Sequence, residues 1–120
     1  MNKGRKTSGG KYHANRKKKS YERKGQENIV ILGEPKSKKL RTHGGFKEII
    51  QLKNEYANVS TLDGIQKVEI TNVLKTPQNR FWARQNKLMK GVIIETSIGK
   101  AKISNRPPKE NVVNAILLKE

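Results

Sequence analysis

The chain has 120 residues and a formal net charge of +17, with 27 Lys and Arg against 10 Asp and Glu. A charge this large repels itself in one short domain unless a polyanion neutralises it, and nucleic acid is the commonest polyanion. The absence of Cys excludes disulfides and thiolate metal sites, and no apolar run is long enough to span a membrane or to form a secretory signal. We therefore expect a soluble intracellular protein with a small core.

The first 27 residues are expected to form a basic N-terminal arm, followed by a single domain over residues 28–120. Residues 1–25 carry ten Lys and Arg against one Glu, a net charge of +9, and only four apolar residues. Such a segment cannot bury enough apolar surface to offset its ordering entropy, so we expect it to be disordered alone or extended on a partner. A merely solubilising tail is the weaker alternative. The candidate RNA contacts of the arm are Lys3, Arg5, Lys6, Gly9, Gly10, Lys11, Arg16, Lys17, Lys18, Lys19, Arg23 and Lys24.

Short strand-like runs separated by turn signals follow from residue 28 onward. The expected strands are 28–32, 46–52, 56–61, 65–74, 92–98, 100–104 and 112–118. Asp63 with Gly64 predicts a tight turn, Gly99 supplies the positive φ of a hairpin, and Pro107 with Pro108 predicts a loop. Six or seven such strands predict an all-β fold, a small sandwich or a six- to seven-stranded barrel. We favour the barrel, because closure of the sheet removes its exposed edges.

The apolar pattern of these runs predicts which faces are buried. Runs 29–32 and 112–118 lack alternation, which is typical of fully buried central strands. The fourth run does alternate, so Val68, Ile70 and Leu74 are expected to face one way, toward the core. The core itself is expected to be small, because apolar residues make up only 32% of the chain.

Residues suited to catalysis or to metal binding are scarce. His13 and His43 are the only histidines and Asp63 is the only Asp, so neither a catalytic triad nor a zinc site finds its residues. Residues 4–11 nearly fit a phosphate-binding loop, but Gly10 stands where that loop needs Lys, and no strand precedes it. We therefore expect no enzyme, no metal and no cofactor.

Two glycine pairs lie among Thr and basic residues. Segments 7–11 and 42–47 each hold adjacent glycines, which let a backbone approach a phosphate closely and expose its N–H donors. Two ordinary flexible turns are the alternative, although the high charge favours phosphate contact. The candidate contacts around the second pair are Arg41, Gly44, Gly45 and Lys47.

Residues 78–87 are the one segment expected to contain a helical turn. Aromatic and basic residues interleave there, and unpaired RNA bases can stack on aromatic or guanidinium planes. The alternative is that a ring plugs one end of the barrel, which we expect of Phe81 or Trp82, since the chain has only six aromatic residues. The basic candidates for RNA contact are Arg80, Arg84, Lys87, Lys90 and, further along, Arg106.

Several strings along the chain are specific enough to carry a family resemblance. They are residues 5–11, 16–22, 41–47, 57–59, 83–86, 112–118 and, most specific of all, 91–107. On these residues the chain resembles the archaeal form of small-subunit ribosomal protein eight, "e" type, a family shared by archaea and eukaryotes. The family often has a second Arg at the position of Gln85 and a glycine-containing loop at 108–111, so one contact and one turn differ here.

The resemblance implies a non-enzymatic β-barrel protein that binds small-subunit ribosomal RNA. Its expected partners are that RNA and neighbouring ribosomal proteins, in the cytoplasm within the ribosome, with no membrane and no small-molecule substrate. Lys outnumbers Arg 20 to 7, which suits phosphate contact more than bidentate reading of bases. Charge alone leaves two alternatives, a DNA-compacting chromatin-type basic protein and a small enzyme; the family strings argue against the first, and the missing catalytic residues against the second.

Overall fold

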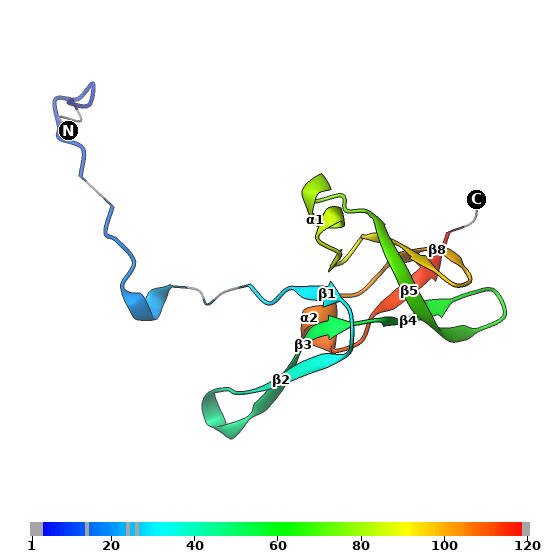
Figure 1. Ribbon diagram of the computed structural model, residues 1–120. Helices are drawn as coiled ribbons and strands as arrows, with labels where there is room; N and C mark the ends of the chain where they lie inside the picture. Colours follow the sequence, from blue (N-terminus) through cyan, green and yellow to red (C-terminus); the bar gives the residue numbers. More distant parts are fainter. Residues whose placement is uncertain (1–3, 14, 24, 26, 119–120) are drawn as a thin grey trace.

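The structure, a computed structural model, describes residues 4–13, 15–23, 25 and 27–118. Its strands form two units, a closed barrel of five strands and a sheet of four (Figure 1). The all-β prediction is confirmed. The barrel has five strands rather than six or seven, because two of the strands expected in it belong to the second sheet.

The barrel strands lie side by side in the order in which they occur along the chain. They are β4 (Tyr56–Ser60), β5 (Ile65–Lys75), β7 (Ile93–Thr96), β8 (Gly99–Ile103) and β9 (Asn114–Leu117). Successive neighbours pair antiparallel, and a parallel pairing of β9 with β4 closes the ring, which leaves the barrel no open edge. The predicted turns are present: Thr61 N donates to Gly64 O at 2.8 Å, and the Thr96 hydroxyl donates to Gly99 O at 2.7 Å.

The second sheet has the strand order β2-β3-β1-β6. Its strands are β1 (Val30–Leu32), β2 (Lys36–Arg41), β3 (Lys47–Asn54) and β6 (Lys87–Leu88). Neither β2 nor β6 was predicted. β2 lies at the edge of the sheet and reads Lys-Ser-Lys-Lys-Leu-Arg, so it has no apolar alternation to reveal it; Lys is nevertheless well suited to an edge strand. β6 has only two residues.

The core is shared between the barrel and the second sheet. It consists of Val30, Ala57, Val59, Val68, Ile70, Val73, Leu88, Val92, Ile94, Ala101, Ile103, Val113 and Ala115. Most of these side chains are small, which fits the narrow interior of a barrel with only five strands. Val30 and Leu88 come from β1 and β6, which pair antiparallel at these two residues, so the second sheet contributes its own apolar face to the common core.

The buried face of β5 changes partway along the strand. Val68 and Ile70 are buried as predicted, but Leu74 is exposed and Val73 takes its place in the core. The pairing of β5 with β7 shifts register twice, first just after Ile70 and again just after Val73. A bulge inserts a residue and so exchanges the two faces of a strand, which is why simple alternation fails at Leu74.

The first and last predicted strands are only half-buried. Ile31 in β1 and Ile116 in β9 are exposed, so the prediction of fully buried strands for 29–32 and 112–118 is wrong. Each strand has one face on the core and one in solvent. They are three and four residues long, too short for apolar alternation to stand out from their apolar flanks.

Two short helices complete the domain. α1 (Arg80–Arg84) lies within the predicted segment 78–87, whereas α2 (Pro107–Glu110) lies where a loop was expected. The prolines of α2 occupy its first positions, where no backbone donor is needed. Asn111 ends α2 at a φ of 57°, and its amide Nδ2 donates to Ile49 O at 2.6 Å, which ties this helix to β3.

The described N-terminal residues run away from the barrel (Figure 1). The Cα radius of gyration is 20.8 Å, whereas a compact chain of this length has a radius of roughly 14 Å. This segment contains one short 3-10 turn, η1 (Ser20–Glu22). The division of the chain at residue 27 stays a prediction.

Candidate nucleic-acid interface

The strands β2 and β3 form a hairpin, residues 36–54, that we call the basic hairpin. It carries six Lys and Arg against a single Glu. Arg41 lies directly opposite Lys47, and Lys36 directly opposite Lys53. Like charges in directly opposed positions destabilise a strand pair, so this arrangement works against the hairpin's own stability. An anion bound between two such cations would attract both, so the pair would then stabilise the bound hairpin.

The tip of the basic hairpin is a tight turn that requires glycine. The 3-10 turn η2 (His43–Gly45) connects the strands, and Thr42 closes it by donating to Phe46 O from its backbone N at 2.8 Å and from its hydroxyl at 3.0 Å. Gly44 and Gly45 have φ values of 76° and 81°, in the left-handed region that glycine adopts without strain. Their contact with phosphate stays a prediction.

The glycine pair of the arm lies in a similar turn. Gly9 N donates to Lys6 O and Lys6 N donates to Gly10 O, both at 2.9 Å. An isolated β-bridge pairs Arg5 with Lys11, and the Arg5 guanidinium donates to Gly9 O at 3.2 Å. The two glycine pairs thus share a geometry, since each turn places an Arg opposite a Lys six residues further along the chain.

The helix α1 presents two cation–ring contacts. Asn79 begins it by accepting a hydrogen bond from Phe81 N at its side-chain oxygen, at 2.9 Å. The Arg80 guanidinium lies 5.1 Å from the centre of the Phe81 ring, and Lys87 Nζ lies 5.0 Å from that of Trp82. Phe81 is exposed and Trp82 only partly buried, so the prediction that a ring plugs the barrel is wrong; Ala83 packs against the core instead.

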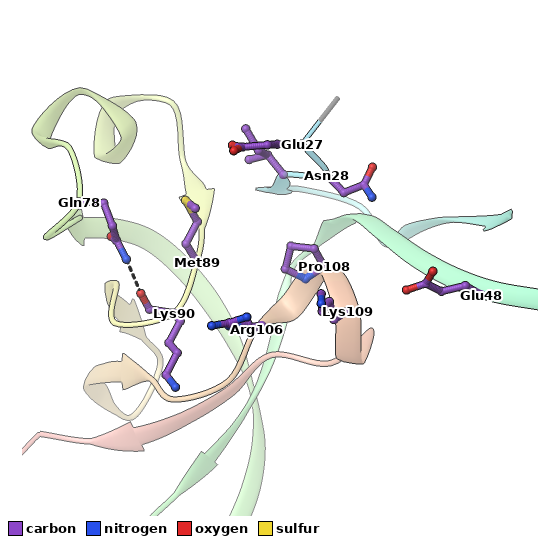
Figure 2. A pocket seen from close by; sticks show the side chains of 10 residues that line it. Glu27, Asn28, Glu48, Gln78, Met89, Lys90, Arg106, Pro108 and Lys109 are labelled. Atoms are coloured by element: carbon purple, nitrogen blue, oxygen red, sulfur yellow. Dashed lines mark hydrogen bonds between the residues drawn. The ribbon is translucent and has the colours of Figure 1, made fainter. Parts of the chain in front are cut away.

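Three of the four candidate cations on 80–90 line two separate hollows, and Lys87 lies over the Trp82 ring instead. Arg80 and Arg84 line a hollow of about 270 Å³ together with Phe81. Lys90 instead lines a cleft of about 820 Å³ between the second sheet and the loops beside the barrel (Figure 2). The Gln78 amide donates to Lys90 O at 2.7 Å and fixes that wall of the cleft.

The cleft of Figure 2 has walls of both charge signs. Arg106, which was also predicted as a contact, and Lys109 line it beside Lys90, while Glu27 and Glu48 line it as acids. Within the described part of the chain, none of these five charged groups forms an ion pair with another. The cleft is therefore less one-sided in charge than the basic hairpin.

Most predicted arm contacts are exposed cations. Arg5, Lys6, Lys11, Arg16, Lys17, Lys18, Lys19 and Arg23 are all exposed, whereas Lys3 and Lys24 lie outside the described residues. Arg16 Nη2 lies 2.7 Å from Glu22 Oε1. This bond, with a second one from the Lys19 backbone N–H, lowers the pKa of the Glu22 carboxyl below its usual value.

The prediction missed the lysines of the edge strand. Lys36, Lys38 and Lys39 on β2, and Lys53 opposite Lys36, are exposed cations of the basic hairpin. The cluster of Lys at 36–39 was visible in the sequence, but because no strand was predicted there, the lysines could not be assigned to a common surface. The exposure of Phe46 at the hairpin tip gave no sequence signal.

Neither a metal-binding cluster nor a membrane-spanning helix is found among the described residues. Among the residues it describes, no three His, Asp or Glu side chains come close enough to hold a metal ion. No helix in the described part of the chain has the length and hydropathy needed to cross a membrane.

The comparisons with known proteins agree with one another. The family described as ribosomal protein S8e matches residues 1–118. Small ribosomal subunit protein eS8 of Methanocorpusculum labreanum is 40% identical over 95% of this chain and 93% of its own length. The eS8 proteins of Methanococcus aeolicus and Methanocella arvoryzae are 40% and 35% identical, over 97% and 95% of this chain and 93% of each relative.

These matches cover the arm as well as the barrel. They confirm the expectation of a non-enzymatic ribosomal protein and leave no support for the chromatin alternative. The chain belongs to the ribosomal protein S8e family.

Proposed function

We propose that this protein is a structural component of the small ribosomal subunit that binds ribosomal RNA mainly through phosphate contacts. The observation that carries the proposal is the pair of glycine turns, in the arm and in the basic hairpin. Each turn holds an Arg and a Lys opposite one another, Arg5 with Lys11 and Arg41 with Lys47. Two cations on adjacent strands repel each other until a phosphate group binds between them.

The exposed cations suit a partner with regularly spaced negative charge. Those of the basic hairpin lie on both of its strands, and Arg41, Lys47 and Lys39 share one face because paired and alternate residues point the same way. A face of this kind can follow a phosphate backbone. The α1 hollow adds two guanidinium groups beside the exposed Phe81 ring, a surface on which an unpaired base can stack.

The arm is proposed to become ordered on RNA. Over residues 1–25 its cations outnumber its acids by nine, and it has too few apolar residues for a core of its own. It is therefore expected to thread along RNA segments as an extended chain, with the Gly9 and Gly10 turn close to phosphate. Amide exchange on the free protein checks this: rapid exchange over residues 1–25 supports it, and a protected arm contradicts it.

The test of the proposal combines crosslinking with competition. The full chain is photocrosslinked to small-subunit ribosomal RNA, and crosslinked peptides are mapped by mass spectrometry. We expect them from the arm, the basic hairpin and α1, and not from the tip of the β4–β5 hairpin. Duplex DNA at equal phosphate concentration is the competitor. Crosslinks confined to the β4–β5 tip, or displacement of the RNA by that DNA, would contradict the proposal.

A further inference from the structure

We infer that Phe46, at the tip of the basic hairpin, stacks on an unpaired base of the bound RNA. The inference rests on the proposed function and names the feature of the RNA that this tip recognises. It assigns the hairpin two roles at once, with cations on the phosphates and a ring on a base.

The Phe46 ring is solvent-exposed although it belongs to a fixed turn. The residue is 75% exposed, so in the free protein its ring forgoes most of the burial free energy that a Phe in the core gains. The backbone of Phe46 is fixed although its ring is exposed, because its carbonyl accepts two hydrogen bonds from Thr42, at 2.8 and 3.0 Å. Binding of a partner then costs ordering entropy for the side chain but little for the backbone.

The contacts of the ring leave most of it available. A Cβ at Gly44 would lie 3.5 Å from both Cδ2 and Cε2 of Phe46, so one edge of the ring rests beside the bare Gly44 backbone. Gly44 therefore supports the ring without covering it. No base can stack on a ring that a side chain covers, so glycine at this position suits a stacking surface.

The charges around the ring favour nucleic acid over an apolar protein partner. Arg41 and Lys47, the cations that end β2 and begin β3, flank the turn and can hold the phosphates on either side of a stacked nucleotide. Leu62, at the tip of the β4–β5 hairpin, is even more exposed at 88%, but its neighbour is Asp63 and no Lys or Arg adjoins it in the turn. Phe46 therefore differs from Leu62 in its position between cations and not in its exposure.

The base must be unpaired. A paired base in an A-form helix presents only its edges in the grooves, and its faces are covered by neighbouring bases. Loops, bulges and helix ends present open faces, and stacking an aromatic side chain on one such base is worth roughly 1–3 kcal/mol. The basic hairpin projects from the body of the domain (Figure 1), so its tip can reach into a loop.

The experiment compares substitutions at Phe46 in the full chain, with affinity for small-subunit ribosomal RNA measured over a salt series. We expect Phe46→Ala to weaken binding roughly 5- to 100-fold. The log–log salt slope should stay unchanged, because no charge is lost. Phe46→Tyr should restore the affinity, whereas Phe46→Leu, which is apolar without a π-face, should not.

The control is Lys47→Ala, which is expected to lower both affinity and salt slope. If Phe46→Ala binds like the parent while Lys47→Ala is weakened, the stacking inference is wrong and the proposed function stands. If the parent itself does not bind the RNA, both are wrong. If Phe46→Leu restores full affinity, the ring makes a merely apolar contact, as in a protein pocket, and stacking is refuted. Thermal melting checks that each variant is folded, which the exposure of Phe46 leads us to expect.

Discussion

The basic hairpin and the β4–β5 hairpin are built from the same kind of element and serve opposite purposes. In the β4–β5 hairpin, Ala57 and Val59 of β4 face Val68 and Ile70 of β5 inside the barrel. Its inward face is part of the core. In the basic hairpin the one deeply buried apolar residue among those described is Ile50. One hairpin therefore stabilises the domain, while the other presents charge.

The difference shows where a protein of this size can place its binding surface. Like-charged pairs cost stability, so they lie on an element that the core does not depend on. The basic hairpin is attached to the rest of the domain through β3, where β1 pairs with Lys53 and Asn54 and where the Asn111 amide donates to Ile49 O. Repulsion at its far end can then persist without opening the barrel.

The largest contrast is expected in stability. Ile70→Ala empties a core position that is 3% exposed, and it should lower the free energy of unfolding by about 2–5 kcal/mol. Ile49→Ala, on the basic hairpin at 42% exposed, should cost less than about 1 kcal/mol. Urea denaturation of both variants measures this. Equal losses would mean that the basic hairpin is as much a part of the core as β5.

The reverse contrast is expected in RNA binding. Replacing both Arg41 and Lys47 with Ala removes two phosphate contacts, and the magnitude of the salt slope should fall by roughly 1.4–1.8. The matched double variant, Leu62→Ala with Ile65→Ala, removes two exposed side chains from the β4–β5 tip and should leave affinity and slope unchanged. Filter binding over a salt series decides, and a larger loss from the β4–β5 variant would reverse the assignment of the two hairpins.

A smaller effect is expected at the tip itself. Gly44→Ala places a side chain at a φ of 76°, which costs roughly 1–2 kcal/mol, so the turn should open more often. Amide exchange at Thr42 N, which bonds Phe46 O, should quicken about 5- to 30-fold. Gly44→Asn is the control, because Asn tolerates the left-handed region better and should show a smaller change. Unchanged exchange in the Ala variant would show that the turn tolerates a Cβ.

The smallest expected effect is a gain in stability, whereas most substitutions lower stability. Lys47→Gln removes one charge of a repelling pair, so the free protein should gain a few tenths of a kcal/mol in unfolding free energy. The gain should shrink at high salt, where the repulsion is screened. Lys38→Gln is the matched control, because Lys38 lies opposite Ile50 and has no cation across the strand. A loss of stability in the Lys47 variant would mean that this pair is not repulsive.

The contrast between the hairpins also separates what could be predicted from what could not. Alternation and turn residues predicted the barrel strands, because burial on one face leaves a period of two in the sequence. The rule of alternation failed at Leu74, because bulges exchange the two faces of β5 there. It also failed at β2, because a strand made mostly of lysines has no buried apolar face to detect. Family strings and charge identified the glycine turns and Arg41 with Lys47, but the direct opposition of those cations depends on strand register.

Other features were missed because the same residues are compatible with more than one structure. Prolines at 107 and 108 predicted a loop, although the same residues can begin a helix, and α2 forms because its first positions need no donors. Phe81 or Trp82 was expected to plug one end of the barrel, but five strands leave room mainly for Val, Ile and Ala. The exposed Phe46 ring is visible only once the hairpin turn is built.

The most direct test of the central claim is the salt dependence of binding by the full chain to small-subunit ribosomal RNA. If the arm and the basic hairpin neutralise phosphates, each neutralised phosphate adds roughly 0.7–0.9 to the log–log slope. The slope should then be steeper than about −4 across low to moderate salt. An affinity that stays flat over that range would show that apolar or base contacts dominate, and that the paired cations of the two glycine turns are not what holds the RNA.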